Sequence, residues 1–165
     1  MKTDEFKKYL STVNNDGLIS LRVMVEGEMA ARNISIDVGD LGEKLAIEFY
    51  NSTPGLPNLM KAPKGAKNVD ALSRDGERYS IKAIMKAKKT GTVYPDSHNP
   101  DKQLFEHLLL VCLNAQYQML SIYSFTWEAF LKARAWDKRM NAWYVPVSRK
   151  RLQLAKRLFP RDTKA

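Results

Sequence analysis

Apolar residues recur at helical spacing in the first third of the sequence. Leu18, Leu21, Val25 and Met29 repeat every three or four residues, which is the spacing of one face of a helix. Asp37 or Asp40 can cap a further helix. The pattern predicts three helices, over residues 4–12, about 17–33 and about 40–51.

The amino-acid composition changes after residue 51. Residues 51–68 contain three prolines and two glycines, which predicts a loop, and its length is typical of a binding loop. Beyond it, short apolar or alternating runs predict strands, and the Asp75-Gly76 dipeptide between the first two predicts a tight hairpin. The predicted strands cover residues 69–73, 78–85, 106–113, 117–125 and 142–147.

Two further helices are expected in the C-terminal part, one over residues 127–135 and a basic amphipathic one over 148–159. Residues 86–103 are polar and rich in turn formers. The order of helices, a strand meander, a helix and a basic tail predicts an α/β or α+β fold with a central mixed sheet flanked by helices. The 165 residues suit a single domain, with N-terminal helices over 1–34, a core over 35–147 and a basic C-terminal helix or tail over 148–165.

The distribution of charge indicates which class of partner the protein would bind. The chain has 27 Lys and Arg against 18 Asp and Glu, a net charge of +9. Residues 61–91 hold nine basic and three acidic side chains, residues 132–165 hold eleven and two, and the remaining segments are mildly acidic. A polyanion would meet those two blocks first, although a solvated Lys and Arg surface has the same composition.

The same composition excludes several classes of protein. No run of about 18 apolar residues is present, so no membrane span is expected, and the N-terminus lacks the apolar segment of a secretory signal. Cys112 is the only cysteine, which excludes an internal disulfide, and two histidines leave little for a zinc site. A cytoplasmic protein without a membrane partner is therefore expected.

The candidate chemistry lies in the predicted hairpin. Its tight turn would place Asp70 and Lys82 on neighbouring strands, and strand alternation puts Ser80 on the same face as Lys82. A carboxylate can hold Mg²⁺ together with waters and a substrate phosphate. A lysine beside it can orient the attacking water or stabilise the transition state.

This Asp…Ser-x-Lys hairpin, preceded by a helix that carries an acid, resembles the PD-(D/E)XK nuclease superfamily. The resemblance covers about residues 35–147 and is closest to small homodimeric restriction endonucleases and short bacterial relatives. It implies a restriction endonuclease-like fold, a homodimer, and hydrolysis of phosphodiester bonds in DNA with Mg²⁺ or Mn²⁺, in a restriction or other defence setting. By position, the family's site residues are Glu43, Asp70, Ser80 and Lys82.

Ser80 departs from the family pattern, in which Glu or Gln stands two residues before the lysine. A serine hydroxyl is a far poorer Mg²⁺ ligand than a carboxylate. Some family members with serine here bring a glutamate from elsewhere, and Glu106 and Glu43 are the candidates in this chain. We therefore expect metal at Asp70 with Glu43 or Glu106, and catalytic roles for Asp70, Lys82 and Ser80.

Six lysines flank this hairpin and are expected to contact the phosphates of DNA. They are Lys61, Lys64, Lys67, Lys86, Lys88 and Lys89.

Other interpretations remain open. Ser80 can mark a catalytically impaired, DNA-binding or complex-building subunit on the same fold, and the basic surface can serve an acidic protein partner. Ser80 and Lys82 could also form a nucleophile and its base, although no oxyanion hole is evident. Asp70 and Lys82 could be ordinary strand residues, Cys112 suits core packing, and His98 and His107 are weak candidates for a general base.

Overall fold

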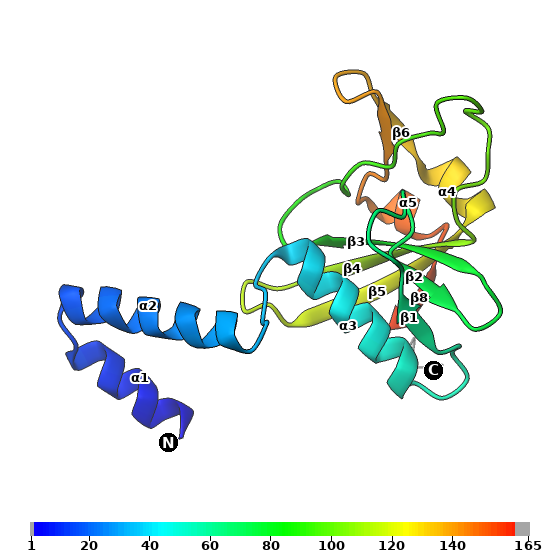
Figure 1. Cartoon of the computed structure of the whole chain (residues 1–165). Coiled ribbons are helices and arrows are strands. Elements are labelled where there is room, and N and C mark those ends of the chain that lie inside the picture. Colours follow the sequence, from blue (N-terminus) through cyan, green and yellow to red (C-terminus); the bar gives the residue numbers. More distant parts are fainter. Residues whose placement is uncertain (1, 161–165) are drawn as a thin grey trace. The chain divides into compact units, whose positions relative to one another are not determined.

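The computed structural model describes residues 2–160. Its chain divides into two compact units, with the boundary between Ser35 and Ile36 (Figure 1). The predicted N-terminal segment of residues 1–34 thus corresponds to a unit of its own.

Two helices form the N-terminal unit, α1 (Thr3–Thr12) and α2 (Asn15–Ala31). The Asn14 side chain caps α2 by accepting a hydrogen bond of 2.8 Å from the Gly17 amide. A Cβ on Gly17 would lie 2.5 Å from Cγ1 of Val13, so the turn between the helices is tightly packed. Both predicted helices are confirmed.

The larger unit is α+β and is built on a mixed sheet of six strands. Their order across the sheet is β1-β2-β3-β4-β5-β8. β3 and β4 are parallel, and the other neighbours in this sheet are antiparallel. The strands are β1 (Leu59–Lys61), β2 (Ala71–Ser73), β3 (Arg78–Ile84), β4 (His107–Leu113), β5 (Met119–Thr126) and β8 (Lys156–Phe159).

Helix α3 (Val38–Ser52) covers one face of this sheet. Its buried residues Ala46 and Tyr50 pack with Tyr79 and Ile81 of β3 and with residues of the neighbouring strands. The two elements approach closely at Gly42, where an added Cβ would lie 2.2 Å from Cβ of Ala83. Glycine is therefore what allows α3 to lie this near β3.

The other face of the sheet is covered by α4 (Trp127–Ala133), by a small sheet of β6 (Ala135–Asp137) and β7 (Ala142–Tyr144), and by the segment between β3 and β4. Phe105 and Phe130 are fully buried here and meet edge to face, with ring centroids 5.2 Å apart. The helix predicted over 127–135 is confirmed.

Two predictions about the elements are wrong. The loop predicted over 51–68 contains β1, which pairs antiparallel with β2. The basic helix predicted over 148–159 is replaced by the short α5 (Arg149–Leu152) and by β8, so the core sheet extends past residue 147. The free edge of β5 needs hydrogen-bond partners, and β8 supplies them while it buries Leu158. The rest of the predicted tail, residues 161–165, lies outside the described residues.

Within residues 2–160, no helix combines the length and the apolar character that crossing a bilayer requires.

Candidate functional site

Asp70 occupies the point where the pairing of β2 with β3 ends. Its amide donates a hydrogen bond of 2.8 Å to the Tyr79 carbonyl, and its own carbonyl accepts one of 2.9 Å from Ala62 after β1. Its carboxylate oxygen Oδ2 accepts a hydrogen bond of 2.6 Å from the Ile81 amide, where a strand carbonyl would otherwise stand. The side chain is thereby fixed one residue from Lys82, as the hairpin predicted.

Lys82 and Ser80 share one face of β3, and Tyr79 and Ile81 pack on the other face beneath α3, which confirms the predicted alternation. Lys82 lies opposite Leu110 of β4 and is half-buried. Ser80 differs from it because its side chain is fully buried, and its hydroxyl has no hydrogen-bond partner among the described residues.

Glu43 is the next residue of α3 after Gly42, where α3 and β3 are in close contact. Gly42 and Ala83 meet at that contact, so Glu43 and Lys82 are the immediate chain neighbours of the two contacting residues. The Glu43 carboxylate forms an ion pair of 3.2 Å with Lys61, whose backbone is paired with Ala71, the residue after Asp70. The structure therefore places Asp70 beside the segment of β3 that carries Lys82. Glu43 lies on the side of the sheet that α3 covers, whereas Lys82 shares the opposite face with Ser80 and its Cδ approaches Gly91 in the segment between β3 and β4.

Glu106 is not brought to this region. It lies four residues before Leu110, the partner of Lys82, and at about 3.3 Å per residue this separation is roughly 13 Å along the strand. Its carboxylate is bound by Arg78 through contacts of 2.7 Å to Nη2, 3.1 Å to Nε and 2.6 Å to the backbone amide. These hydrogen bonds lower the pKa of Glu106 below its ordinary value, although partial burial opposes the shift.

The six lysines predicted to bind phosphate are all exposed, but two of them are engaged in ion pairs. Lys61 binds Glu43. Lys89 lies 3.1 Å from Asp137 and 4.8 Å from the ring centre of Tyr144. The other four, Lys64, Lys67, Lys86 and Lys88, form no ion pair within the described part of the chain.

A cleft of about 640 Å³ opens beside the hairpin, and the sequence did not indicate it. Its wall includes Lys67, Arg78 and Lys102, of which Lys102 forms an ion pair of 3.5 Å with Asp96. Asn68, which also lines the cleft and directly precedes Val69 and Asp70, donates a hydrogen bond of 2.9 Å to the Tyr94 carbonyl. The cleft thus lies next to the candidate site with three basic side chains in its wall, two of them paired, Lys102 with Asp96 and Arg78 with Glu106. It is assembled from segments too far apart in sequence to form a motif.

The candidate site contains few carboxylates. Within residues 2–160, the structure contains no cluster of three or more Asp, Glu, His or Cys side chains suited to a metal ion. Asp70 and Glu43 remain, and Mg²⁺ is bound in many enzymes by one or two carboxylates that water and substrate phosphates complete. The Asp70 oxygen Oδ1 has no hydrogen-bond partner among the described residues, so this oxygen is available to coordinate such an ion.

No protein-family model and no curated protein matches the chain.

Proposed function

We propose that the larger unit is a metal-dependent, endonuclease-like domain that acts on DNA, on a fold of the PD-(D/E)XK kind. One observation carries the proposal: the Asp70 carboxylate is held against the Ile81 amide, directly beside Lys82. The helix that precedes the hairpin supports it, because α3 crosses β3 where Gly42 meets Ala83 and carries the acid Glu43 directly after that crossing.

In this proposal Asp70 and Glu43 hold Mg²⁺, which would lower the pKa of a bound water and neutralise charge on the scissile phosphate. The Lys82 ammonium group orients the attacking water and stabilises the charge that develops on the phosphate oxygens. Binding of Glu43 to the ion would release it from Lys61, which would leave the lysine charge available to a phosphate. We assign Ser80 no step in this proposal, because its fully buried hydroxyl reaches neither water nor substrate in this conformation. The catalytic role expected for Ser80 stays a prediction.

DNA would approach along the basic surface on both sides of the hairpin. Lys64 and Lys67 precede it, Lys86 and Lys88 follow it, and the neighbouring cleft adds Arg78 and Lys102. Contacts of this kind bind the phosphate backbone without reading base sequence.

A second function is favoured by Ser80 and Glu106. The residue in the position of the second acid is a buried serine, and Glu106 is fully engaged by Arg78. A chain that keeps the basic surface but holds too few carboxylates would bind DNA without cutting it, as a catalytically impaired or complex-building subunit.

Plasmid nicking separates the two functions. With Mg²⁺ or Mn²⁺, the nuclease proposal expects wild-type nicking, at least a tenfold lower rate in Asp70→Asn and in Lys82→Met, and an unchanged rate in Asp75→Asn. The Asp70→Asn variant keeps a carbonyl oxygen that can accept the Ile81 hydrogen bond, so the fold is preserved while the negative charge is lost. Asp75 is a matched control because it is an exposed acid in the turn of the same hairpin.

Absence of wild-type nicking, or equal nicking by all variants, would refute the catalytic proposal. A salt-sensitive gel shift of DNA that persists in EDTA would then establish the binding function. Ser80→Glu adds a further measurement, since a gain of Mg²⁺ binding would show that only this carboxylate is missing.

A further inference from the structure

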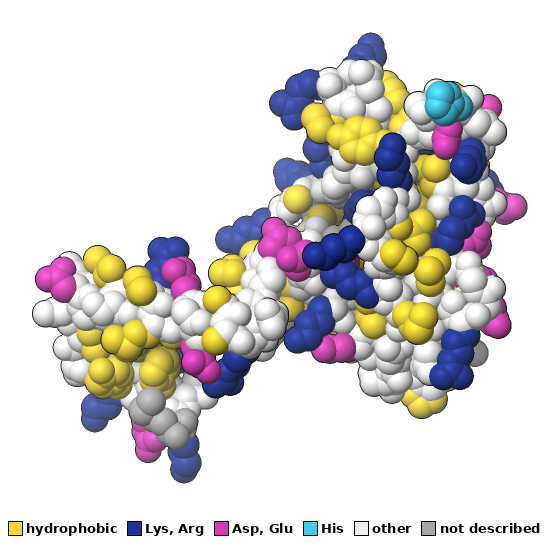
Figure 2. Space-filling model, in the orientation of Figure 1, with side chains coloured by type: hydrophobic (Ala, Val, Ile, Leu, Met, Phe, Trp, Pro, Cys, Tyr) yellow, Lys and Arg dark blue, Asp and Glu magenta, His cyan; other side chains and the backbone are white. Residues whose placement is uncertain are grey.

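The N-terminal unit exposes an unusual amount of apolar surface. None of the side chains in α1 or α2, both of which lie wholly within the described residues, is buried. Phe6 and Tyr9 of α1 are exposed, and hydrophobic side chains are visible over this unit in Figure 2. On α2 the exposed large apolar residues are Leu18, Ile19, Val23, Met24 and Val25.

The two helices make few contacts with each other beyond the turn that joins them. Leu10, Val13 and Leu21 are only partly exposed, and Gly17 packs against Val13 at the turn. Ile19 and Val23, one helical turn apart, lie on another side of α2 and are among its most exposed residues. The two helices therefore leave an apolar face of α2 exposed within this unit.

A unit of this size needs further support. A 10-residue helix such as α1 is marginal in water by itself, and domains below about 40 residues depend on disulfides, metals or oligomerisation. Residues 1–35 contain neither cysteine nor histidine, which excludes a disulfide or a zinc site within the unit. Association with another protein surface is the remaining source of stability.

The charge of the unit indicates which surface that is. Residues 1–35 carry five basic and five acidic side chains, and two ion pairs within α2, Arg22 with Glu26 and Glu28 with Arg32, pair charges internally. The excess of +9 therefore belongs to residues 36–165. A nucleic acid, an acidic protein or an anionic membrane would bind that second unit, whereas a neutral apolar face does not repel its own copy.

We propose that the α1–α2 hairpin is a dimerisation surface whose partner is the same hairpin of a second copy of the chain. Two helical hairpins joined by an isologous contact form a four-helix arrangement, in which each copy presents the same patch. The proposal rests on this unit alone and does not depend on nuclease activity.

The apolar area fits a small interface. Fully burying a Val, Leu, Ile, Phe or Met side chain removes roughly 60–120 Å² of apolar area from water, so seven half-exposed side chains offer about 200–400 Å² per chain. A standard interface takes about 800 Å² from each partner, of which about 450 Å² is apolar. We therefore expect a dimer that dissociates on dilution.

Sedimentation of the full chain over a range of concentrations tests this. The wild type should change from one to two chain masses as its concentration rises, and Met24→Glu should raise the dissociation constant about tenfold or more. The matched control is Met60→Glu on β1, because Met60 is as exposed as Met24, at 64% against 65%, and should leave the constant within a factor of two.

Hydrogen exchange keeps the test decisive even where a variant disturbs the helix. In the wild type, protection of the amides in residues 15–31 should rise with concentration, whereas the amides of β4 should stay protected throughout. A monomer at every concentration would overturn the proposal. If its α2 amides were protected, the hairpin would pack on its own chain; if they were unprotected, its partner would be a different molecule.

Discussion

The contact of Gly42 with Ala83 leads to a prediction that opposes simple helix propensity. Alanine is the better helix former, by about 0.8–1.0 kcal/mol, so Gly42→Ala in a 15-residue helix should stabilise the protein if propensity decides. We predict the opposite sign, because the added methyl group would lie 2.2 Å from Cβ and 3.5 Å from Cα of Ala83.

The magnitude follows from that distance. Carbon atoms in contact prefer about 3.5–4.0 Å, so α3 must move away from β3 by roughly 1.5 Å. Alanine has no rotamer that relieves the clash, and overpacking of this kind costs about 1–3 kcal/mol. After the propensity gain is subtracted, we expect a net loss of up to about 2 kcal/mol, together with a displacement of α3 and its Glu43 away from β3.

Urea unfolding followed by tryptophan fluorescence measures the loss. The double variant Gly42→Ala/Ala83→Gly should recover most of it, because the second substitution removes the Cβ atom with which the new methyl group clashes. The coupling energy should equal the cost of that clash, about 1–3 kcal/mol. Gly27→Ala in α2 is the propensity control, since a Cβ there would meet nothing within 4 Å and should raise helicity.

A Gly42→Ala variant as stable as the wild type, or more stable, would refute the argument that steric contact outweighs propensity at this position. Absence of coupling in the double variant would show that any loss has another cause.

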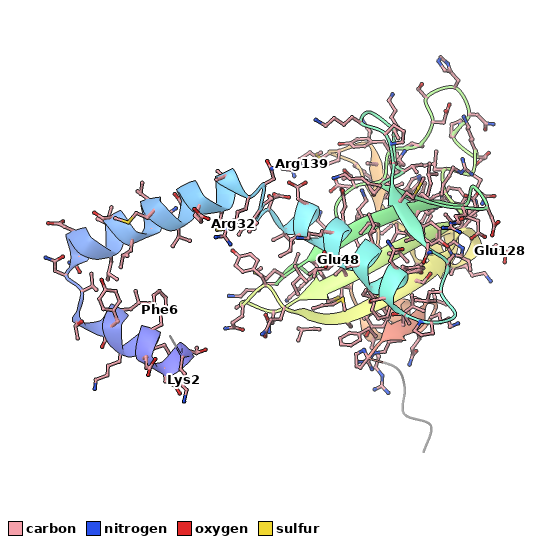
Figure 3. All side chains as sticks on the ribbon, turned by 60° about the horizontal axis from the view of Figure 1, so that its bottom comes forward. Lys2, Phe6, Arg32, Glu48, Glu128 and Arg139 are labelled. Atoms are coloured by element: carbon pink, nitrogen blue, oxygen red, sulfur yellow. The ribbon has the colours of Figure 1, made fainter. Side chains whose placement is uncertain are left out.

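Three further predictions concern ionisable groups. Glu106→Gln should cost about 1–2 kcal/mol in urea unfolding near neutral pH, allowing for partial exposure, and this cost should vanish as pH falls, because a carboxyl group whose pKa is lowered in the folded state stabilises the fold only above that pKa. Glu48, labelled in Figure 3, forms an exposed ion pair with Lys44, and Glu48→Gln should change stability by less than about 0.5 kcal/mol. Burial raises the pKa of the Cys112 thiol, so a thiol reagent at mildly alkaline pH should react slowly until the protein is unfolded, and rapid reaction of the folded chain would contradict this. Burial also raises the pKa of Tyr50 to about 12, so stability should fall between about pH 10 and 12 and fall less in Tyr50→Phe, which pH-dependent unfolding measures.

Local pattern predicted most of the elements. The repeat of Leu18, Leu21 and Val25 predicted α2, and the Asp75-Gly76 turn, with Gly76 at a φ of 83°, predicted the hairpin that places Asp70 beside Lys82. These features depend on neighbours within a dozen residues, which is the range over which sequence periodicity is informative.

The features that were missed depend on distant partners. β1 is three residues long and exists because β2 offers an edge, and β8 forms against β5 although its basic segment has helical spacing. The pairing of Arg78 with Glu106 joins residues 28 apart at the start of two parallel strands, so no local signal identified Arg78 as the partner of Glu106, for which a structural role and a metal role were both open.

The parallel pairing of β3 with β4 also constrains the order in which the chain can fold. Parallel neighbours need a crossover, and here the crossover of residues 85–106 contains no helix of its own. It is anchored instead by residues that come much later, through Thr90 to Val145 and through Val93 to Trp143, with backbone hydrogen bonds of 2.7–3.0 Å. During synthesis, pairing β3 with β4 therefore carries the entropic cost of closing the loop of residues 85–106 before the residues that hold this loop in place have been made. We expect a nascent chain that ends before residue 142 to hold β3 and β4 only loosely, and the residues from 142 onward to convert that intermediate into the folded sheet.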